Sequence, residues 1–506
     1  MANASLEIHV INISQGDAIL VVNRDVPKLQ AKVSAVTGAP TEPMDFLPFA
    51  VEQKLDLHGT VTKALLIDGG DGDYGGFVED YLRQVGVAPA ASDYVPELSL
   101  MISHHHADHA AGLRSVYKKA VPVPPPPPKP TKKKGKKKAV PPPVKMVDHY
   151  RPAAVYRPKD DSRKPSDREL YYKVLLKDLD AAAAATVTPT QIHVLDKGGV
   201  TGAAPTKIDL GKGGTGPKAL PITVHVIGSA QGVWDAVTSK VVDIDNPAGL
   251  DQNDRSMIVM IEYGSFRFFA AGDIAGNGQA AGGNTGANAA STAGKKWFSS
   301  SHADVESRLG PALEAYFPRT VTPAAGSPQQ KSAGCCTVLK VSHHGSNSST
   351  DVYSLATLRP EIALISSGLR PKFHGHPTQA VLNRLAQSQT ADWGIRGQPA
   401  TVTTPNTVSG VYITEIAEQV NSTAFTVDIR EAVIVGDIVV RPTDESVRAV
   451  QDEAAFDQAA LDVRVYGTRV ATAATKATTT VRAASAGTSA LTYYPYGPDE
   501  FTVDRH

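Results

Sequence analysis

The sequence predicts a mixed α/β protein, in which short strands and helices follow one another along most of the chain. Short apolar stretches with alternating polarity, such as residues 6–13, are typical of β-strands. Other apolar stretches run through a polar loop into a helical pattern, as residues 98–119 do. With 506 residues, 42% of them hydrophobic and 20% charged, the chain has the composition of a globular protein.

Charge and cysteine content limit the classes of function. The formal net charge is zero, so the chain as a whole has no electrostatic attraction to nucleic acids or membranes. No apolar stretch approaches the roughly 20 residues of a membrane helix, and the N-terminus does not resemble a signal peptide. Cys335 and Cys336 are neighbours, which rarely form a disulfide and cannot supply a cysteine-rich zinc site. We therefore expect a cytoplasmic protein with no membrane partner.

The first elements form a predicted hairpin, with strands at residues 6–13 and 18–22 and turn-forming residues between them. The strand expected at residues 63–67 ends in Asp68, which is followed by glycines. An acidic residue and glycines at a strand end favour a loop that faces a functional site. Next we expect a helix, a strand and a second helix at residues 76–85, 98–102 and 113–119.

The same alternation of elements continues toward the C-terminus. Strands are predicted at residues 155–156, 191–195, 222–227, 257–263, 266–271, 337–341, 362–366, 425–429 and 432–440. Helices are predicted at residues 168–179, with Asp167 as N-cap, and at 305–316, 350–358, 378–385 and 444–461. Residues 257–271 and 425–440 are each expected to fold as a hairpin.

Three segments interrupt this pattern and predict insertions, at residues 24–60, 121–145 and 275–300. We expect one domain at residues 1–445, followed by a C-terminal extension at residues 446–506, part of it disordered.

The segment at residues 121–145 is rich in proline and lysine, which favours an extended, disordered chain. It is either a solvated linker, the interpretation we favour, or a basic arm that binds nucleic acid by counterion release.

The most informative stretch is the loop after the strand at residues 98–102. It carries His104, His106, Asp108 and His109 in the pattern HxHxDH. Alternate residues of an extended segment share a face, so His104 and His106 can bind one ion. Asp108 and His109 lie at the start of the next helix and can serve a second ion. Imidazoles with a carboxylate suit zinc, with iron or manganese as alternatives. A surface histidine tract is the other interpretation, but such tracts lie at termini, whereas this one lies between a strand and a helix.

Two further strand ends carry metal-binding residue types. Asp273 follows the second strand of the hairpin at residues 257–271, and His343 and His344 follow the strand at residues 337–341. Two divalent ions about 3.5–4 Å apart need negative charge between them, which makes Asp273 the candidate bridging ligand. Taken alone, Asp273 is equally consistent with an ordinary turn residue.

The order of these motifs resembles the metallo-β-lactamase fold, and in particular the hydrolase domain of ComEC-type DNA-uptake competence proteins. The motifs lie at residues 12–20, 66–70, 104–112, 253–256, 268–273, 339–346 and 375–377. The resemblance implies a four-layer αββα sandwich with two metal ions at one edge between the sheets. Those competence proteins are embedded in membranes, whereas this chain has no apolar stretch long enough for a membrane helix. We therefore expect a free-standing relative rather than a DNA transporter.

Carried to this sequence, the resemblance implies a specific ligand set. His104 and His106 would hold the first metal, Asp108, His109 and His343 the second, and Asp273 would bridge them. Asp68 would orient the histidine loop. The superfamily often has a third histidine on the first metal. His225 is the best-placed candidate for it, with a plain strand residue as the alternative.

These residues predict a hydrolase. A dinuclear centre lowers the pKa of bound water to about 7, and Asp108 can orient that water or take its proton. His344 or His376 can donate a proton, and Asn253 and Ser256 either bind substrate or brace the site. We expect a phosphodiester substrate, such as nucleic acid. The alternatives are another ester or amide, such as a lactone, a β-lactam or a phosphocholine ester, and a non-catalytic binding module.

Overall fold

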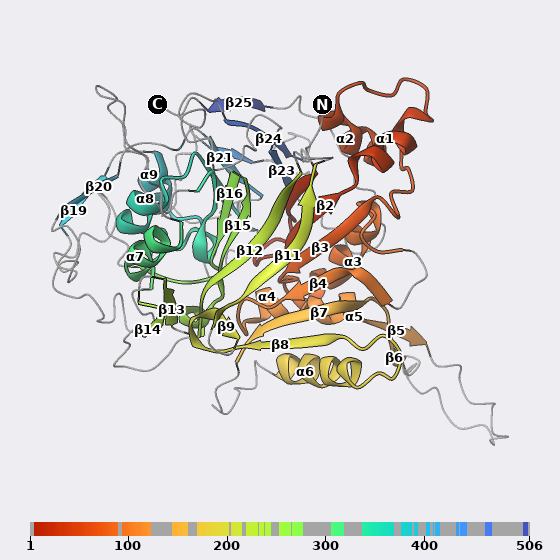
Figure 1. Ribbon diagram of the computed structural model, residues 1–506, viewed down its shortest axis with the longest axis horizontal. Helices are drawn as coiled ribbons and strands as arrows, with labels where there is room; N and C mark the ends of the chain where they lie inside the picture. The colour runs from red at the N-terminus through yellow and green to blue at the C-terminus, as the bar shows by residue number, and fades with distance from the viewer. Residues whose placement is uncertain are drawn as a thin grey trace, which may run out of the picture.

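The chain has a mixed α/β fold with two large β-sheets (Figure 1). The computed structural model describes residues 5–89, 94–122, 144–159, 170–201, 204–214, 219–230, 232–236, 238–243, 252–264, 266–276, 305–317, 336–368, 376–386, 389–392, 401–404, 408, 410–414, 432–434, 436–442, 461–467 and 499–503. Within these residues, no helix combines the length and the apolar character needed to cross a membrane.

The first sheet has nine strands in the order β25-β24-β23-β1-β2-β3-β4-β7-β8. Its strands are β1 (Leu6–Val10), β2 (Ile19–Arg24), β3 (Val61–Ile67), β4 (Tyr94–Met101), β7 (Arg151–Pro158), β8 (Gln191–Leu195), β23 (Ile438–Pro442), β24 (Leu461–Gly467) and β25 (Asp499–Val503). The predicted hairpin is confirmed, because β1 and β2 pair antiparallel with Val10 opposite Ile19. From β3 to β8 the neighbouring strands are parallel, so their carboxyl ends lie at one edge.

The second sheet has ten strands. They are β11 (Lys207–Gly213), β12 (Leu220–Ser229), β13 (Gly232–Asp235), β14 (Lys240–Asp243), β15 (Ile258–Tyr263), β16 (Phe266–Ala270), β17 (Val338–Lys340), β18 (Ile362–Ile365), β21 (Gly410–Ile413) and β22 (Ala432–Ile434). The predicted β15–β16 hairpin is confirmed, and β16, β17, β18, β21 and β22 run parallel. Short pairs outside the two sheets are β5 (Lys118–Pro122) with β6 (Val144–Asp148), β9 (Val200–Thr201) with β10 (Ala204–Pro205), and β19 (Gln389–Asp392) with β20 (Thr401–Thr404).

The central core lies between the two sheets, because one buried cluster contains residues of both. Ile8 and Val21 contribute to it from the first sheet, and Val224, Phe268 and Leu364 from the second. Every second residue of a strand faces the same side. Alternation therefore leaves the other apolar row of each sheet to pack against helices.

Helices cover those other faces. The helices that share a core with the first sheet are α3 (Gly75–Gln84), α4 (Ala107–Ala110), α5 (Leu113–Tyr117) and α6 (Leu170–Ala183). Those that share a core with the second sheet are α7 (Glu306–Tyr316), α8 (Val352–Leu358) and α9 (Gln379–Ala386). In Figure 1 the first group lies beside β4, β7 and β8, and the second group lies on the opposite side of the molecule.

The segment expected as an insertion at residues 24–60 is folded. It forms α1 (Val26–Ser34) and α2 (Phe46–Glu52), which pack in a small core of their own together with Val439 of β23. Asp25 caps α1, since its carboxylate accepts a hydrogen bond from the Lys28 amide at 3.1 Å.

The prediction that residues 432–440 form one strand, the second of a hairpin, is wrong. The stretch expected as one strand at residues 432–440 divides into β22 and β23, which belong to different sheets. The break falls at Gly436 (φ +77°), a backbone conformation that glycine adopts without strain. The expected C-terminal extension contributes β24 and β25 to the first sheet. The other predictions at residues 123–143, 160–169, 277–304, 415–431 and 443–460 fall outside the described residues.

Candidate metal centre

The histidine loop begins where β4 ends, and α4 and α5 follow it directly. The ring centroids of His104 and His106 are 4.8 Å apart, and those of His104 and His109 are 4.2 Å apart. A close backbone contact holds the loop in place, because the Gly112 amide donates to the Gly70 carbonyl at 2.7 Å. A Cβ atom on Gly112 would lie 1.8 Å from the Gly69 carbonyl oxygen, so only glycine fits there.

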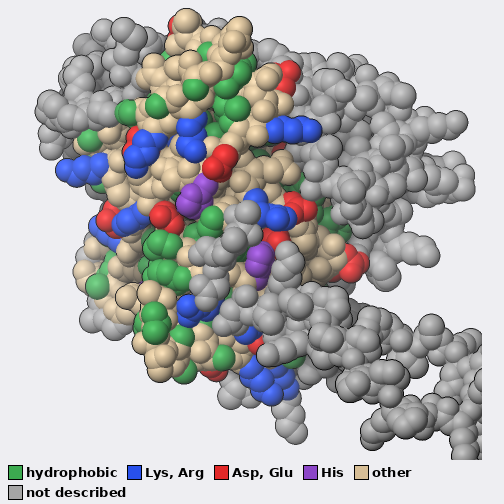
Figure 2. All heavy atoms as spheres, turned by 90° about the vertical axis from the view of Figure 1, so that its right-hand side faces the viewer, with side chains coloured by type: hydrophobic (Ala, Val, Ile, Leu, Met, Phe, Trp, Pro, Cys, Tyr) green, Lys and Arg blue, Asp and Glu red, His purple; other side chains and the backbone are tan. Residues whose placement is uncertain are grey.

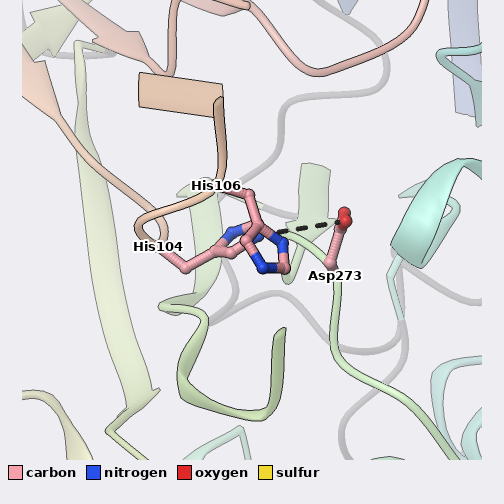
Figure 3. A group of neighbouring side chains, drawn as sticks. All are labelled: His104, His106 and Asp273. Atoms are coloured by element: carbon pink, nitrogen blue, oxygen red, sulfur yellow. Dashed lines mark ion pairs between the residues drawn. The ribbon is translucent and has the colours of Figure 1, made fainter. Parts of the chain in front are cut away.

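Asp273 reaches the same point from the second sheet. It follows β16 after Gly272, whose φ of +51° turns the chain. The Asp273 amide donates to Ser256 Oγ at 3.0 Å, which fixes the backbone that carries the carboxylate. Figure 3 shows the His104 and His106 rings side by side and directed toward Asp273. The sequence prediction that these three residues meet is borne out, since their ligand atoms lie within 4.8 Å of one another.

His344 completes a second group with Asp108 and His109. Its Nε2 atom lies 3.6 Å from Asp108 Oδ2 and 3.4 Å from Asp273 Oδ1. Asp273 therefore lies between the two groups, which is the place expected of a bridging carboxylate.

Of the two histidines after β17, the structure places His344 in the second group instead of His343. His343 was the expected ligand, but it belongs to neither group, and its Nε2 lies 3.7 Å from Asp273 Oδ2 with 13% of its side chain exposed. His344 is 1% exposed and faces the centre. Both residues have left-handed φ angles, 48° and 53°, in the turn η7 (Ser342–Gly345). This turn directs the second histidine inward, which an extended strand end would not do.

Each of three imidazoles has its Nδ1 atom held by an oxygen. The contacts are His109 Nδ1 with Asp68 Oδ2 at 2.8 Å, His104 Nδ1 with Ser103 Oγ at 3.0 Å, and His344 Nδ1 with the Ser366 carbonyl at 2.9 Å. A carbonyl and a carboxylate only accept hydrogen bonds. Ser103 Oγ donates its own proton to Asp68 at 2.5 Å, so it accepts from His104. All three Nδ1 atoms are therefore donors.

The opposite ring nitrogens converge. The Nε2 atoms of His104, His109 and His344 lie 3.9, 3.2 and 3.4 Å from the Asp273 carboxylate. Within the described part of the chain, none of the three has a hydrogen-bond partner, and neither does Asp273 Oδ1. Buried polar atoms are rarely left in this state unless something binds them. Imidazoles that are tethered through Nδ1 and turn their Nε2 atoms toward a common carboxylate are what a metal site requires.

The electrostatics of the pocket are set by burial and by these contacts. Burial alone would raise the pKa of Asp273, but the imidazoles of His109, His344 and His343 hold that pKa well below its usual range. Burial alone would lower the pKa of His109 and His344, but Asp273 and the other nearby carboxylates hold both pKa values well above the usual range. Burial and the neighbouring imidazoles of His109 and His106 hold the pKa of His104 well below its usual range. Without metal the pocket therefore keeps protons on His109 and His344, and a divalent ion must displace them.

Asp68 has the orienting position that the sequence predicted. Besides contacting His109, its carboxylate accepts a hydrogen bond from the Ser103 amide at 2.7 Å. It is 1% exposed and holds both ends of the histidine loop.

His225 does not reach the centre. Its neighbours Val224 and Val226 face the core between the sheets, so alternation along β12 turns His225 to the other face. There its Nε2 contacts Glu262 Oε2 at 2.9 Å and its ring packs against Phe317. The alternative prediction, a plain strand residue, fits this placement.

The other predicted residues lie around the centre. Ser256 braces Asp273, and its own amide donates to the Asn253 carbonyl at 3.0 Å, which favours the bracing role for this turn over substrate binding. The His376 ring lies 5.6 Å from that of His343, at the rim of the site. His105 turns away and stacks on Tyr172 at 4.1 Å.

Asp17 and Lys340 are near the centre and were not predicted. Asp17 forms a third group with His109 and Asp273, and it pairs with the buried Lys340 at 2.7 Å. The sequence did contain a signal for this pair, namely a lysine within the apolar strand at residues 337–341. Lysine is almost never buried unless it is paired, so a buried acidic partner could have been expected.

No protein-family model matches the chain, and a search of curated proteins finds no match either.

Proposed function

We propose that the chain is a metallo-hydrolase with a dinuclear centre that acts on phosphodiesters. The observation that carries this proposal is the convergence of three tethered imidazoles on Asp273, each with an Nε2 atom that lacks a hydrogen-bond partner among the described residues. The ligand set we propose is His104 and His106 for one ion, Asp108, His109 and His344 for the other, and Asp273 between them. Zinc fits these nitrogen and carboxylate ligands best, with manganese as the alternative.

The proposed fold is the four-layer αββα sandwich of metallo-β-lactamase-like hydrolases, similar to the hydrolase domain of ComEC-type competence proteins. It is supported by two sheets that share a core and by helices packed on their other faces. The carboxyl ends of β3, β4, β16 and β17 all lead into the candidate centre, as expected for a ligand site at the edge of parallel strands.

A pair of divalent ions bound here would supply a water of lowered pKa and would offset negative charge on the phosphoryl oxygens. Asp108 is placed to orient that water and accept its proton, because its carboxylate lies beside His344 at the open side of the group. His376, at the rim, is the proposed proton donor to the leaving group. Two divalent ions carry more positive charge than Asp108 and Asp273 neutralise, so an anionic diester suits the site.

The proposal is tested by metal content and turnover. Zinc-loaded protein is incubated with bis-p-nitrophenyl phosphate, nitrocefin and single-stranded DNA, and metal per chain is measured alongside. We expect about two ions per chain and hydrolysis of the phosphodiesters. Turnover of nitrocefin alone would favour the amide and ester alternative, and bound metal without turnover would favour a binding module.

The chain offers a matched control in the same loop. His104→Ala should abolish tight binding of one ion and turnover, whereas His105→Ala should leave both in place, because His105 stacks on Tyr172. Equal losses in the two variants would contradict the proposed ligand set.

Nucleic acid is the proposed macromolecular substrate, and the lysine-rich segment, for which a linker is the favoured interpretation, is tested as an added contact. On the face in Figure 2 the Lys and Arg side chains of described residues are interspersed with Asp and Glu. Residues 129–138 contain seven lysines. Their deletion should flatten the dependence of DNA binding on salt, by up to about 0.7 in logarithmic slope per lysine that contacts phosphate. An unchanged slope would identify the segment as a linker.

A further inference from the structure

The buried ion pair between Asp17 and Lys340 crosses the two sheets beside the candidate centre. Lys340 Nζ donates to Asp17 Oδ2 at 2.7 Å, and the two side chains are 1% and 2% exposed. We infer that this pair sets the charge of the pocket and keeps Asp17 from acting as an additional metal ligand. The inference rests on the proposed function.

Asp17 is held within reach of the metal ligands. It lies in the turn between β1 and β2, where its amide donates to the Asp108 carbonyl at 3.1 Å and its carbonyl accepts from the Gly70 amide at 2.9 Å. Its carboxylate lies within 4.8 Å of the ligand atoms of His109 and Asp273. No hydrogen bond to Asp17 Oδ1 forms within the described residues, although His344 Nδ1 is 3.5 Å away. The carboxylate thus has an oxygen available toward the centre.

Lys340 approaches the same carboxylate from the second sheet. Two positions before it on β17, Val338 faces the core between the sheets, so alternation directs Lys340 into the same space at the end of the strand. Besides Asp17, its ammonium group contacts only the Val341 carbonyl, at 3.0 Å, among the hydrogen bonds of the described residues. A lysine in that position needs a negative partner, and Asp17 supplies it.

Charge decides what each partner does to a bound cation. Without Lys340, Asp17 would be an unpaired carboxylate beside the two groups of proposed metal ligands, and it would attract bound metal ions more strongly. Without Asp17, an unpaired ammonium group would repel them. The two losses should therefore change metal affinity in opposite directions. A pair that only joined the sheets would give losses of the same sign.

The test uses Lys340→Met, Asp17→Asn and the double variant, with zinc affinity measured by competition with a fluorescent chelator. We expect Lys340→Met to bind zinc about tenfold more tightly and Asp17→Asn about tenfold more weakly, with the double variant close to the original protein. Glu7→Gln, which removes a buried charge at the other end of the β1–β2 hairpin, is the control and should leave the zinc affinity unchanged. Should Lys340→Met fail to fold, rescue of Asp17→Asn by the second substitution carries the same conclusion.

Zinc affinities that change in the same direction in both single variants, or that change in neither, would overturn this inference and leave the proposed function untouched. A protein that binds no zinc before any substitution would overturn the proposed function, and this inference with it.

Discussion

The β1–β2 hairpin carries a buried ion pair at each end, and the two pairs differ in what surrounds them. At the open end, Arg24 and Glu7 form two hydrogen bonds of 2.7 Å with both side chains fully buried. Two further Arg24 protons go to Thr60 Oγ1 at 2.7 Å and the Val85 carbonyl at 3.0 Å. At the turn, the Asp17–Lys340 pair lies beside imidazole nitrogens that have no hydrogen-bond partner among the described residues.

The difference separates two uses of buried charge in one protein. The open end is a closed network in the sense that Arg24 and Glu7 bind each other through both carboxylate oxygens. The turn end leaves donor and acceptor atoms facing a common point, an arrangement that costs stability unless a ligand binds there. Burial alone therefore does not indicate function, whereas the convergence of several buried ligand atoms on one point does.

The largest effect should come from breaking the closed network. Glu7→Gln leaves the Arg24 guanidinium buried without its counter-charge, and arginine cannot release its proton. We expect a loss of about 3–5 kcal/mol in the free energy of unfolding, measured by urea denaturation. The surface variant Glu52→Gln on α2 should change it by less than about 0.5 kcal/mol. A small effect of Glu7→Gln would contradict the closed-network interpretation.

The same pair predicts how acid affects stability. Burial would raise the pKa of Glu7, but Arg24, His9 and Arg441 hold it below its usual value of 4.5. The contribution of the Glu7 carboxylate to the free energy of unfolding is thus present in full above about pH 4.5, and it is lost as the pH falls toward the lowered pKa. Urea denaturation of the original protein and Glu7→Gln between pH 7 and 3 should show the two stabilities converging in acid. Parallel curves would show that Glu7 does not contribute in this way.

Breaking the turn end should affect ligand binding more than stability. Asp273→Asn removes the carboxylate between the two groups, and the expected loss in zinc affinity is at least about 100-fold, measured by chelator competition. The metal-free protein should lose less stability than Glu7→Gln does, because imidazoles can release protons when their counter-charge is removed. A stability loss as large as that of Glu7→Gln would remove the distinction between the two ends.

The smallest effect should come from the residue that braces Asp273. Ser256→Ala removes one hydrogen bond to the Asp273 amide, which is worth about 1 kcal/mol in a folded protein. We expect a loss of about tenfold in zinc affinity and of about 1 kcal/mol in unfolding free energy, measured by the same two methods. Unchanged zinc affinity would show that the backbone of Asp273 is held well enough without it.

The sequence predicted what local pattern determines. The histidine loop, Asp273 and Asp68 follow apolar strands, and their place at strand ends together with the resemblance identified them as candidates, although Asp273 alone was equally consistent with a turn residue. The choice between His343 and His344 was not predictable, because it depends on two left-handed backbone angles within one turn. Asp17 was missed for another reason. Its neighbours Lys340 and Ser366 belong to the other sheet, and a single sequence does not show which residues meet across two sheets.

The Gly16–Asp17 turn contacts segments that follow strands of both sheets, since Ser366 Oγ, after β18, donates to the Gly16 carbonyl at 2.6 Å, and the Asp17 amide donates to the carbonyl of Asp108, after β4. Because the chain is synthesised from its N-terminus, the histidine loop emerges long before the segment that carries His344 and Ser366. A partly translated chain cannot assemble the ligand set, so any hydrolytic activity should begin only after the second sheet has been made. For the proposed hydrolase, such timing would protect cellular esters until both sheets have folded, without the need for a separate inhibitor.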